Sequence, residues 1–116
     1  MLGTLAIIQG PDQGRSHSFG RQQKLTIGRG TNNAIRLNDS QASRVHCEVA
    51  YDGDRVVVTD AGSSSGTWVN GVQIKAPRDI QPGDVIVVGE THLAFQWSDA
   101  DQHPTEAWDP SKKLKP

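Results

Sequence analysis

Apolar residues along the chain alternate with polar residues or occur in short runs. The clearest runs cover residues 5–8, 25–27, 56–58, 85–88 and 93–95. Successive side chains of a strand point to opposite faces, so this pattern predicts β-strands, and none of the runs has the spacing of an amphipathic helix. We therefore expect a chain built from short strands.

Turn-forming residues separate these runs at close intervals. They include Gly10-Pro11, Asp52-Gly53, Asn70-Gly71 and Pro82-Gly83. The Asn70-Gly71 pair is the strongest signal, because a two-residue hairpin turn needs positive φ at both central positions and these two residue types tolerate it. Many short strands joined by such turns are typical of an all-β sandwich or barrel.

The length of the chain fits one domain with a single core. It has 116 residues. After Trp97 the composition changes to a polar stretch that includes the pair Lys112-Lys113. A polar segment of this kind has too few apolar residues to join a core. We expect a domain over residues 1–98 and a polar tail or linker over residues 99–116.

The charge and the single cysteine exclude several classes of protein. With 12 Lys+Arg and 13 Asp+Glu the formal net charge is −1, so no overall positive field is available to hold a nucleic acid, and any anion site must be local. No apolar run approaches the roughly 20 residues of a membrane span. Cys47 is alone and cannot form an internal disulfide. We expect a cytoplasmic protein that binds neither nucleic acid nor membrane.

Three polar loops between the strands contain residues suited to a phosphate. They contribute Arg29 between two glycines, Ser43 in the segment Ser-Arg-Val-His, and Ser64 in a Ser/Gly-rich segment. If the strands form a sandwich, loops at one end meet in space. An arginine can hold two phosphate oxygens at once, while hydroxyls and exposed backbone amides bind the remaining lone pairs. The sequence therefore predicts a phosphate site at Arg29, Ser43 and Ser64.

The same loops also contain residue types that are found in catalytic sites. Ser43 and His46 could be a nucleophile and base, but the sequence places no acidic third member beside them. Cys47 shares an apolar strand face with Val49 and Tyr51, which indicates a core position.

The other three histidines have no metal-ligand spacing and no cysteine partner; they are His17, His92 and His103. Zinc is therefore unsupported. We expect no catalysis, no metal and no cofactor.

The combined motifs resemble the signature of the forkhead-associated (FHA) domain. Gly28-Arg29, then SRVH at residues 43–46, then DAGSSSGTWVNG at residues 60–71 follow one another in the family's order, and the resemblance spans about residues 2–97. It implies a two-sheet antiparallel-type β-sandwich with its binding loops clustered at one end. It also implies a module that binds phosphothreonine in partner proteins.

The resemblance assigns roles to individual residues. Arg29, Ser43 and Ser64 match the phosphate ligands, and Arg44 would contact the phosphate or the peptide backbone. Gln41 and Ser65 match positions that contact the peptide. A further set matches residues that support the loops, namely Gly28, His46, Gly66 and Asn70.

One residue departs from the family pattern. Ser65 stands where the family usually has asparagine, and a serine has a shorter reach with fewer donors. We therefore expect this departure to affect how the peptide main chain is held, and not the phosphate.

The expected partner is a phosphothreonine-containing protein, a Ser/Thr kinase or its substrate. The alternative is a scaffold of the same fold that binds partners without phosphate, although such a scaffold needs no arginine between glycines opposite two serine loops. If Thr105 in the polar tail is phosphorylated, it should dock on the site of a neighbouring molecule and cause self-association.

Overall fold

The computed structural model describes residues 2–21 and 23–98, which form two packed β-sheets without a helix. The strands are β1 (Leu2–Gln9), β2 (Ser16–Phe19), β3 (Lys24–Gly28), β4 (Ile35–Arg36), β5 (Cys47–Asp52), β6 (Arg55–Asp60), β7 (Thr67–Val69), β8 (Val72–Gln73), β9 (Arg78–Ile80), β10 (Val85–Val88) and β11 (Thr91–Ser98). Thr105 and the rest of the predicted tail lie outside the described residues, so self-association through Thr105 stays a prediction.

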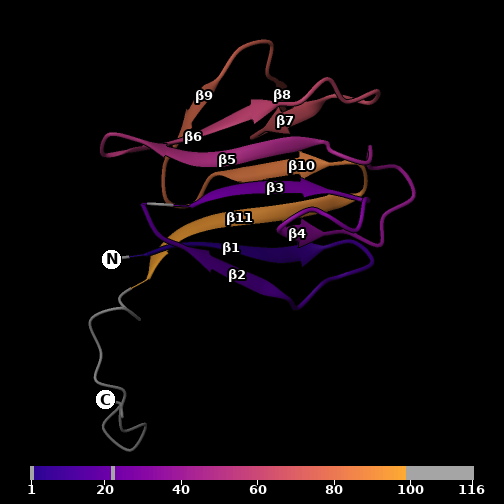
Figure 1. The fold of residues 1–116 in the computed structure, drawn as a ribbon, viewed down its shortest axis with the longest axis horizontal. Coiled ribbons are helices and arrows are strands. Elements are labelled where there is room, and N and C mark those ends of the chain that lie inside the picture. Colours follow the sequence, from indigo (N-terminus) through magenta and orange to yellow (C-terminus); the bar gives the residue numbers. More distant parts are fainter. Residues whose placement is uncertain (1, 22, 99–116) are drawn as a thin grey trace, which may run out of the picture.

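The two sheets lie face to face, as Figure 1 shows. One has six strands in the order β2-β1-β11-β10-β7-β8, and the other has five in the order β4-β3-β5-β6-β9. The predicted sandwich is confirmed, and its strand pairs are antiparallel with one exception. Strand β4 runs parallel to β3, with Ile27 opposite Ile35 and Gly28 opposite Arg36, because residues 29–34 loop back beside the strand they leave.

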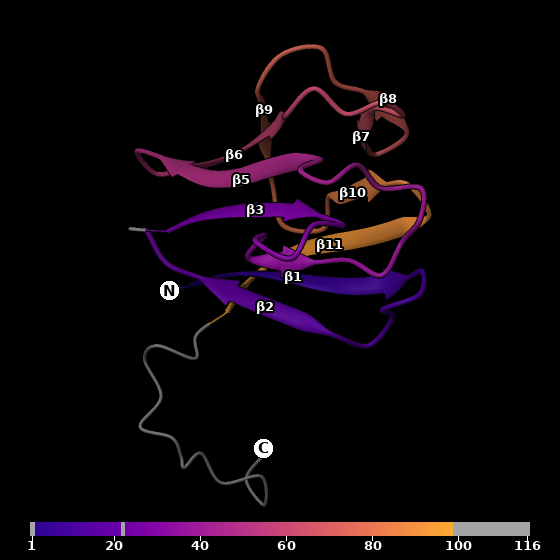
Figure 2. The same ribbon diagram turned by 45° about the vertical axis from the view of Figure 1, so that its right-hand side comes forward.

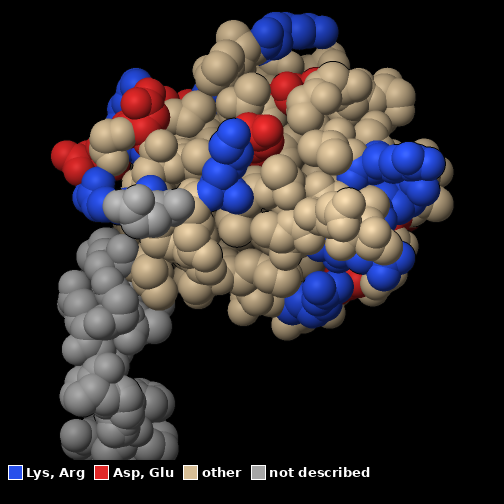
Figure 3. Space-filling view, in the orientation of Figure 1, with Lys and Arg blue, Asp and Glu red and all other residues tan. Residues whose placement is uncertain are grey.

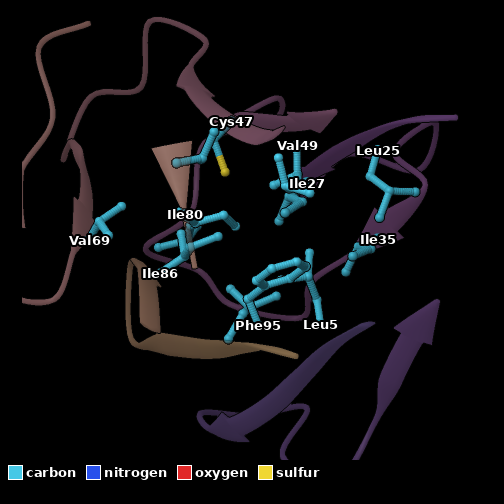
Figure 4. Packing of buried hydrophobic residues seen from close by; sticks show 14 of the residues in the cluster. Leu5, Leu25, Ile27, Ile35, Cys47, Val49, Val69, Ile80, Ile86 and Phe95 are labelled. Carbon is cyan, nitrogen blue, oxygen red and sulfur yellow. The ribbon is translucent and has the colours of Figure 1, made fainter. Parts of the chain in front are cut away.

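The core lies between the sheets and follows the alternation of apolar residues. Leu5, Ile27, Val49, Ile86 and Phe95 come from both sheets, and each is fully buried (Figure 4).

Cys47 belongs to the same core, as the sequence predicted. Burial, with a smaller contribution from the charge of Asp60, raises the pKa of its thiol to about 12. The thiol is therefore protonated at neutral pH and is part of the packing.

The Asn70-Gly71 turn joins β7 and β8 as predicted, with positive φ at both residues (51° and 82°). The Asn70 side chain also binds the start of β10. Its Nδ2 donates to the Asp84 carboxylate at 2.9 Å, and its Oδ1 accepts from the Val85 amide at 2.9 Å. Asn70 therefore ties the hairpin to the neighbouring strand in the same sheet.

The first and last described residues of the domain, Leu2 and Ser98, lie at the opposite end of the sandwich from the three polar loops. Leu2 pairs with Ser98 at one end. At the other, the end of β3, the start of β5 and the end of β6 are adjacent, since Cys47 pairs with both Ile27 and Asp60. The loops that follow β3, precede β5 and follow β6 therefore meet there (Figures 1 and 2). Nowhere in residues 2–21 or 23–98 is there a helix long and apolar enough to cross a membrane.

Candidate functional site

The loop after β3 and the loop before β5 are joined by backbone hydrogen bonds. The Arg29 amide donates to the Ser43 carbonyl at 2.9 Å, and the Gly30 amide donates to the Arg44 carbonyl at 3.0 Å. These two bonds continue the pairing of β3 with β5 into the loops beyond the strand ends. As a result, Arg29 lies directly beside Ser43, as the sequence predicted.

Gly28 is required where these two loops approach each other. A Cβ atom at this position would lie 2.3 Å from the Arg44 carbonyl oxygen and 2.9 Å from the Ser43 carbonyl oxygen. Both neighbours are backbone atoms, so they cannot move aside as a flexible side chain could. Gly28 therefore sets the distance between Arg29 and the serine loop.

Gly28→Ala is expected to destabilise the domain by about 1 to 3 kcal/mol, because the added methyl group must push two backbone segments apart. Urea denaturation measures the change. The matched control is Gly20→Ala, whose Cβ would meet only the Leu2 side chain at 3.5 Å and the Gln23 side chain at 3.8 Å. Equal stabilities for the two variants would show that the close approach at Gly28 has no energetic weight.

The Arg29 side chain is exposed and only partly engaged. Its Nε donates to the Ala42 carbonyl at 3.0 Å. Within the part of the chain that the structure describes, its terminal nitrogens make no hydrogen bond or ion pair. The Nε contact orients the guanidinium plane, while two NH₂ groups are left free to donate to an anion.

Ser43 and Ser64 meet across the second and third loops. Their Oγ atoms are 3.3 Å apart, and the Ser64 amide donates to Ser43 Oγ at 3.1 Å. The structure thus brings together the three residues that were predicted to bind phosphate. Two hydroxyls and an arginine fork on adjoining loops are donors of the kind that a phosphate group needs.

His46 joins the same two serine loops from inside the protein. The imidazole is fully buried. Its Nδ1 accepts from the Ser43 amide at 3.0 Å, so Nε2 carries the proton and donates to the Gly66 carbonyl at 2.7 Å. Both ring nitrogens are therefore occupied by backbone groups, which makes His46 a support of the loops and leaves no lone pair to activate Ser43 Oγ.

Asp60 organises the loop that contains Ser64. Its carboxylate accepts from the Gly62 amide at 3.0 Å, the Ser63 amide at 3.1 Å and the Thr67 hydroxyl at 2.7 Å, and also from the Ser63 hydroxyl. Burial raises the pKa of Asp60, but these hydrogen bonds outweigh it and hold the pKa below its usual value. An ionised Asp60 thus fixes the conformation in which Ser64 faces Ser43.

Asp39 has a similar part in the loop before β5. It is 1% exposed and accepts from the amides of Gln41 (2.9 Å) and Glu90 (2.7 Å) and from the Thr91 hydroxyl (2.7 Å). It therefore ties this loop to the turn between β10 and β11. Sequence reasoning assigned no role to Asp39 or Asp60. The available signal is the residue type itself, because an aspartate in a loop commonly accepts a hydrogen bond from the amide two residues further on.

The two predicted peptide contacts lie beside each other at the edge of the site. Ser65 Oγ is 3.4 Å from the Gln41 carbonyl. Together with Trp68 and Glu90 they line a cavity of about 230 Å³. The predicted supports differ in place: Gly28, His46 and Gly66 hold the loops, whereas Asn70 binds β10, as described above.

The chain belongs to the FHA domain family, whose model matches residues 25–89. Domains of this family are phosphothreonine-binding modules. This class of protein agrees with the sandwich fold and with the arginine and serines at its loop end.

Particular relatives share the domain. The chain is 34% identical over 92 residues to FhaA of Mycobacterium tuberculosis, covering 78% of this chain and 17% of FhaA. It is 35% identical over 94 residues to an oxoglutarate dehydrogenase inhibitor of Corynebacterium jeikeium, covering 78% of this chain and 62% of the inhibitor. The chain thus spans less than two thirds of either relative.

A solved FHA domain has the same fold. It comes from a structural and functional analysis of phosphothreonine-dependent FHA domain interactions, and it superposes with a TM-score of 0.75 at 28% identity, covering 84% of this chain and 98% of that one.

Proposed function

We propose that this chain binds a phosphothreonine-containing segment of a partner protein, with Arg29, Ser43 and Ser64 as the phosphate ligands. The observation that carries the proposal is the meeting of three separate loops at one point: Arg29 is hydrogen-bonded to Ser43 through the backbone, and Ser43 to Ser64 through a side chain. A phosphoryl group has nearly two negative charges and three acceptor oxygens, and this set offers a planar cation with two hydroxyls.

Other residues have supporting parts in the proposal. Arg44 contacts the phosphate or the peptide backbone, and Gln41 and Ser65 contact the peptide beyond it. Residues 1–98 form the binding domain, and residues 99–116 are a tail or linker.

The protein acts by binding and catalyses nothing. The support for this is that His46, the histidine whose ring binds the Ser43 amide, has both ring nitrogens engaged.

The partner is a Ser/Thr kinase or one of its substrates. Because Ser/Thr kinases transfer phosphate from ATP, the location that we propose for this interaction is the cytoplasm.

The experiment that tests the proposal is a binding screen with two immobilised peptide libraries. Both have random flanking residues; one has phosphothreonine at the fixed position and the other has threonine. We expect binding to the phosphothreonine library alone. Equal binding to both would identify a scaffold that ignores phosphate.

Ser65→Asn is expected to tighten binding of the selected phosphothreonine peptide by about 0.5 to 1.5 kcal/mol, because a longer side chain with an amide can add one hydrogen bond to the peptide backbone. Ser65 is exposed, and its hydroxyl makes only a long 3.4 Å contact with Gln41, so little is lost on replacement. Calorimetry measures the change, with Ser65→Ala as the control that removes the hydroxyl alone. Weaker binding by the asparagine variant would show that the site is adapted to serine.

A further inference from the structure

Two further arginines, Arg36 and Arg44, line a cavity together with the proposed phosphate ligand Arg29. The loops after β3 and before β5 surround a cavity of about 680 Å³, and its lining includes Arg29, Arg36 and Arg44 but no aspartate or glutamate. Figure 3 shows Lys and Arg side chains gathered at the end of the molecule where these loops lie. Arg29 is already assigned to the phosphate, whereas Arg36 has no part in the proposed function.

The parallel pairing of β4 with β3 places Arg36 there. Ile35 and Leu37 are fully buried on either side of it, so alternation turns the Arg36 side chain outward. Gly28 is its partner in the register, and Arg36 Nε donates to the Arg29 carbonyl at 3.4 Å. Arg36 is thus held against the backbone of Arg29, and both arginines line the same cavity.

The three guanidinium groups have unused donors. Among the described residues, the terminal nitrogens of Arg29 and Arg36 and the whole side chain of Arg44 make neither a hydrogen bond nor an ion pair. Two nearby acidic residues are already satisfied: Asp12 binds Asn38 and Arg15, and Asp39 accepts from the Gln41 and Glu90 amides and the Thr91 hydroxyl.

Three like charges that share one cavity repel each other unless an anion compensates them. A phosphothreonine has nearly two negative charges and so compensates at most two of these three cations, which leaves a positive charge at Arg36, the arginine that has no part in the proposed phosphate site. The opening therefore attracts a further negative group from the same ligand.

We propose that Arg36 forms a second anion subsite that selects peptides with a carboxylate or a second phosphate close to the phosphothreonine. The inference rests on the proposed function, since the phosphothreonine fixes where the rest of the peptide lies. Arg36 does not touch the first phosphate in this arrangement. It determines which phosphothreonine peptides bind best.

The test is a positional scan with synthetic phosphothreonine peptides. Each position from three residues before to three residues after the phosphothreonine is in turn glutamine, glutamate or phosphoserine, and affinities are measured by fluorescence anisotropy. A peptide with threonine in place of phosphothreonine but with the same glutamates is included.

For the wild type we expect glutamate or phosphoserine at one or two positions to tighten binding about three- to tenfold over glutamine, the range of a partly exposed charged hydrogen bond. A larger gain from phosphoserine identifies a second phosphate as the preferred group, and an equal gain identifies a carboxylate as sufficient.

Variants of Arg36 test whether this side chain causes the preference for acidic peptides. Arg36→Gln should bind the neutral-flank phosphothreonine peptide within about twofold of wild type but lose the acidic preference, and Arg36→Lys should keep part of it because the charge remains and the fork is lost. The control is Arg21→Gln, which removes the same charge at the opposite end, where Arg21 pairs with Asp54.

The possible failures are distinct. If the wild type binds neutral and acidic phosphothreonine peptides equally, or if Arg21→Gln loses the preference as fully as Arg36→Gln, the second subsite is overturned while the phosphothreonine site stands. If the threonine peptides bind as well as the phosphothreonine peptides, both proposals are overturned.

Discussion

Arg29→Ala is expected to weaken binding of a phosphothreonine peptide by about 2 to 5 kcal/mol, because the phosphate would lose a planar cation that can hold two of its oxygens while its charge stays partly desolvated. That loss corresponds to a factor of roughly 30 to 4,000 in Kd. The fold should persist, since the Arg29 side chain is exposed and gives up one hydrogen bond, to the Ala42 carbonyl. Calorimetry with the peptide selected from the phosphothreonine library measures the change.

Two further variants separate charge from geometry in this prediction. Arg29→Lys keeps the charge but not the planar fork, so we expect an intermediate loss. Arg21→Ala removes one positive charge far from the site and should change the affinity by less than twofold, or about 0.4 kcal/mol. Near-equal affinities of wild type and Arg29→Ala would contradict the assignment of Arg29 to the phosphate.

His46→Ala is expected to lower the free energy of unfolding by about 3 to 5 kcal/mol. The replacement leaves the Ser43 amide and the Gly66 carbonyl without partners, at about 1 to 3 kcal/mol each, and it opens a cavity where a fully buried ring had been. The phosphate affinity should fall as well, because the two serine loops lose the link that sets their distance. Urea denaturation and calorimetry measure the two effects.

Variants that keep one of the two hydrogen bonds of the His46 ring separate their contributions to stability. An asparagine oxygen can take the place of Nδ1 and a glutamine amide that of Nε2, so His46→Asn and His46→Gln should each lose less stability than His46→Ala. His92→Ala is the control: it lies on the outward side of β11 and should cost about 1 kcal/mol or less. If His46→Ala is no more costly than His92→Ala, the imidazole does not hold the loops.

The longer strands that face the core on one side could be predicted from sequence, whereas three short edge strands, β2, β4 and β9, could not. β1, β3, β6, β10 and β11 each have two or more apolar residues at alternate positions or in a run, so their period is visible. β2, β4 and β9 each bury one residue, namely Phe19, Ile35 and Ile80. One apolar residue has no period, and these strands form only because a neighbouring strand offers its free backbone groups.

The sequence could predict which arginine and serines meet at the loop end, and the loop supports Gly28, His46 and Gly66, but not the two carboxylates that order the loops. An arginine between glycines and two serine-bearing loops are visible in the sequence, and their order along the chain carries the family signature. The hydrogen bonds of Asp39 and Asp60 depend on which loops meet, and the parallel turn of β4 that brings Arg36 to the cavity depends on a pairing without a sequence pattern.

The most direct test of the central claim is a ¹⁵N–¹H NMR titration with the selected phosphothreonine peptide and with the same peptide containing threonine. If these three residues bind the phosphate, the phosphothreonine peptide shifts the amide signals of Arg29, Ser43 and Ser64 most strongly, while the threonine peptide at the same concentration shifts none of them. Equal shifts with both peptides, or shifts concentrated at the opposite end of the sandwich around Gly53, would contradict it.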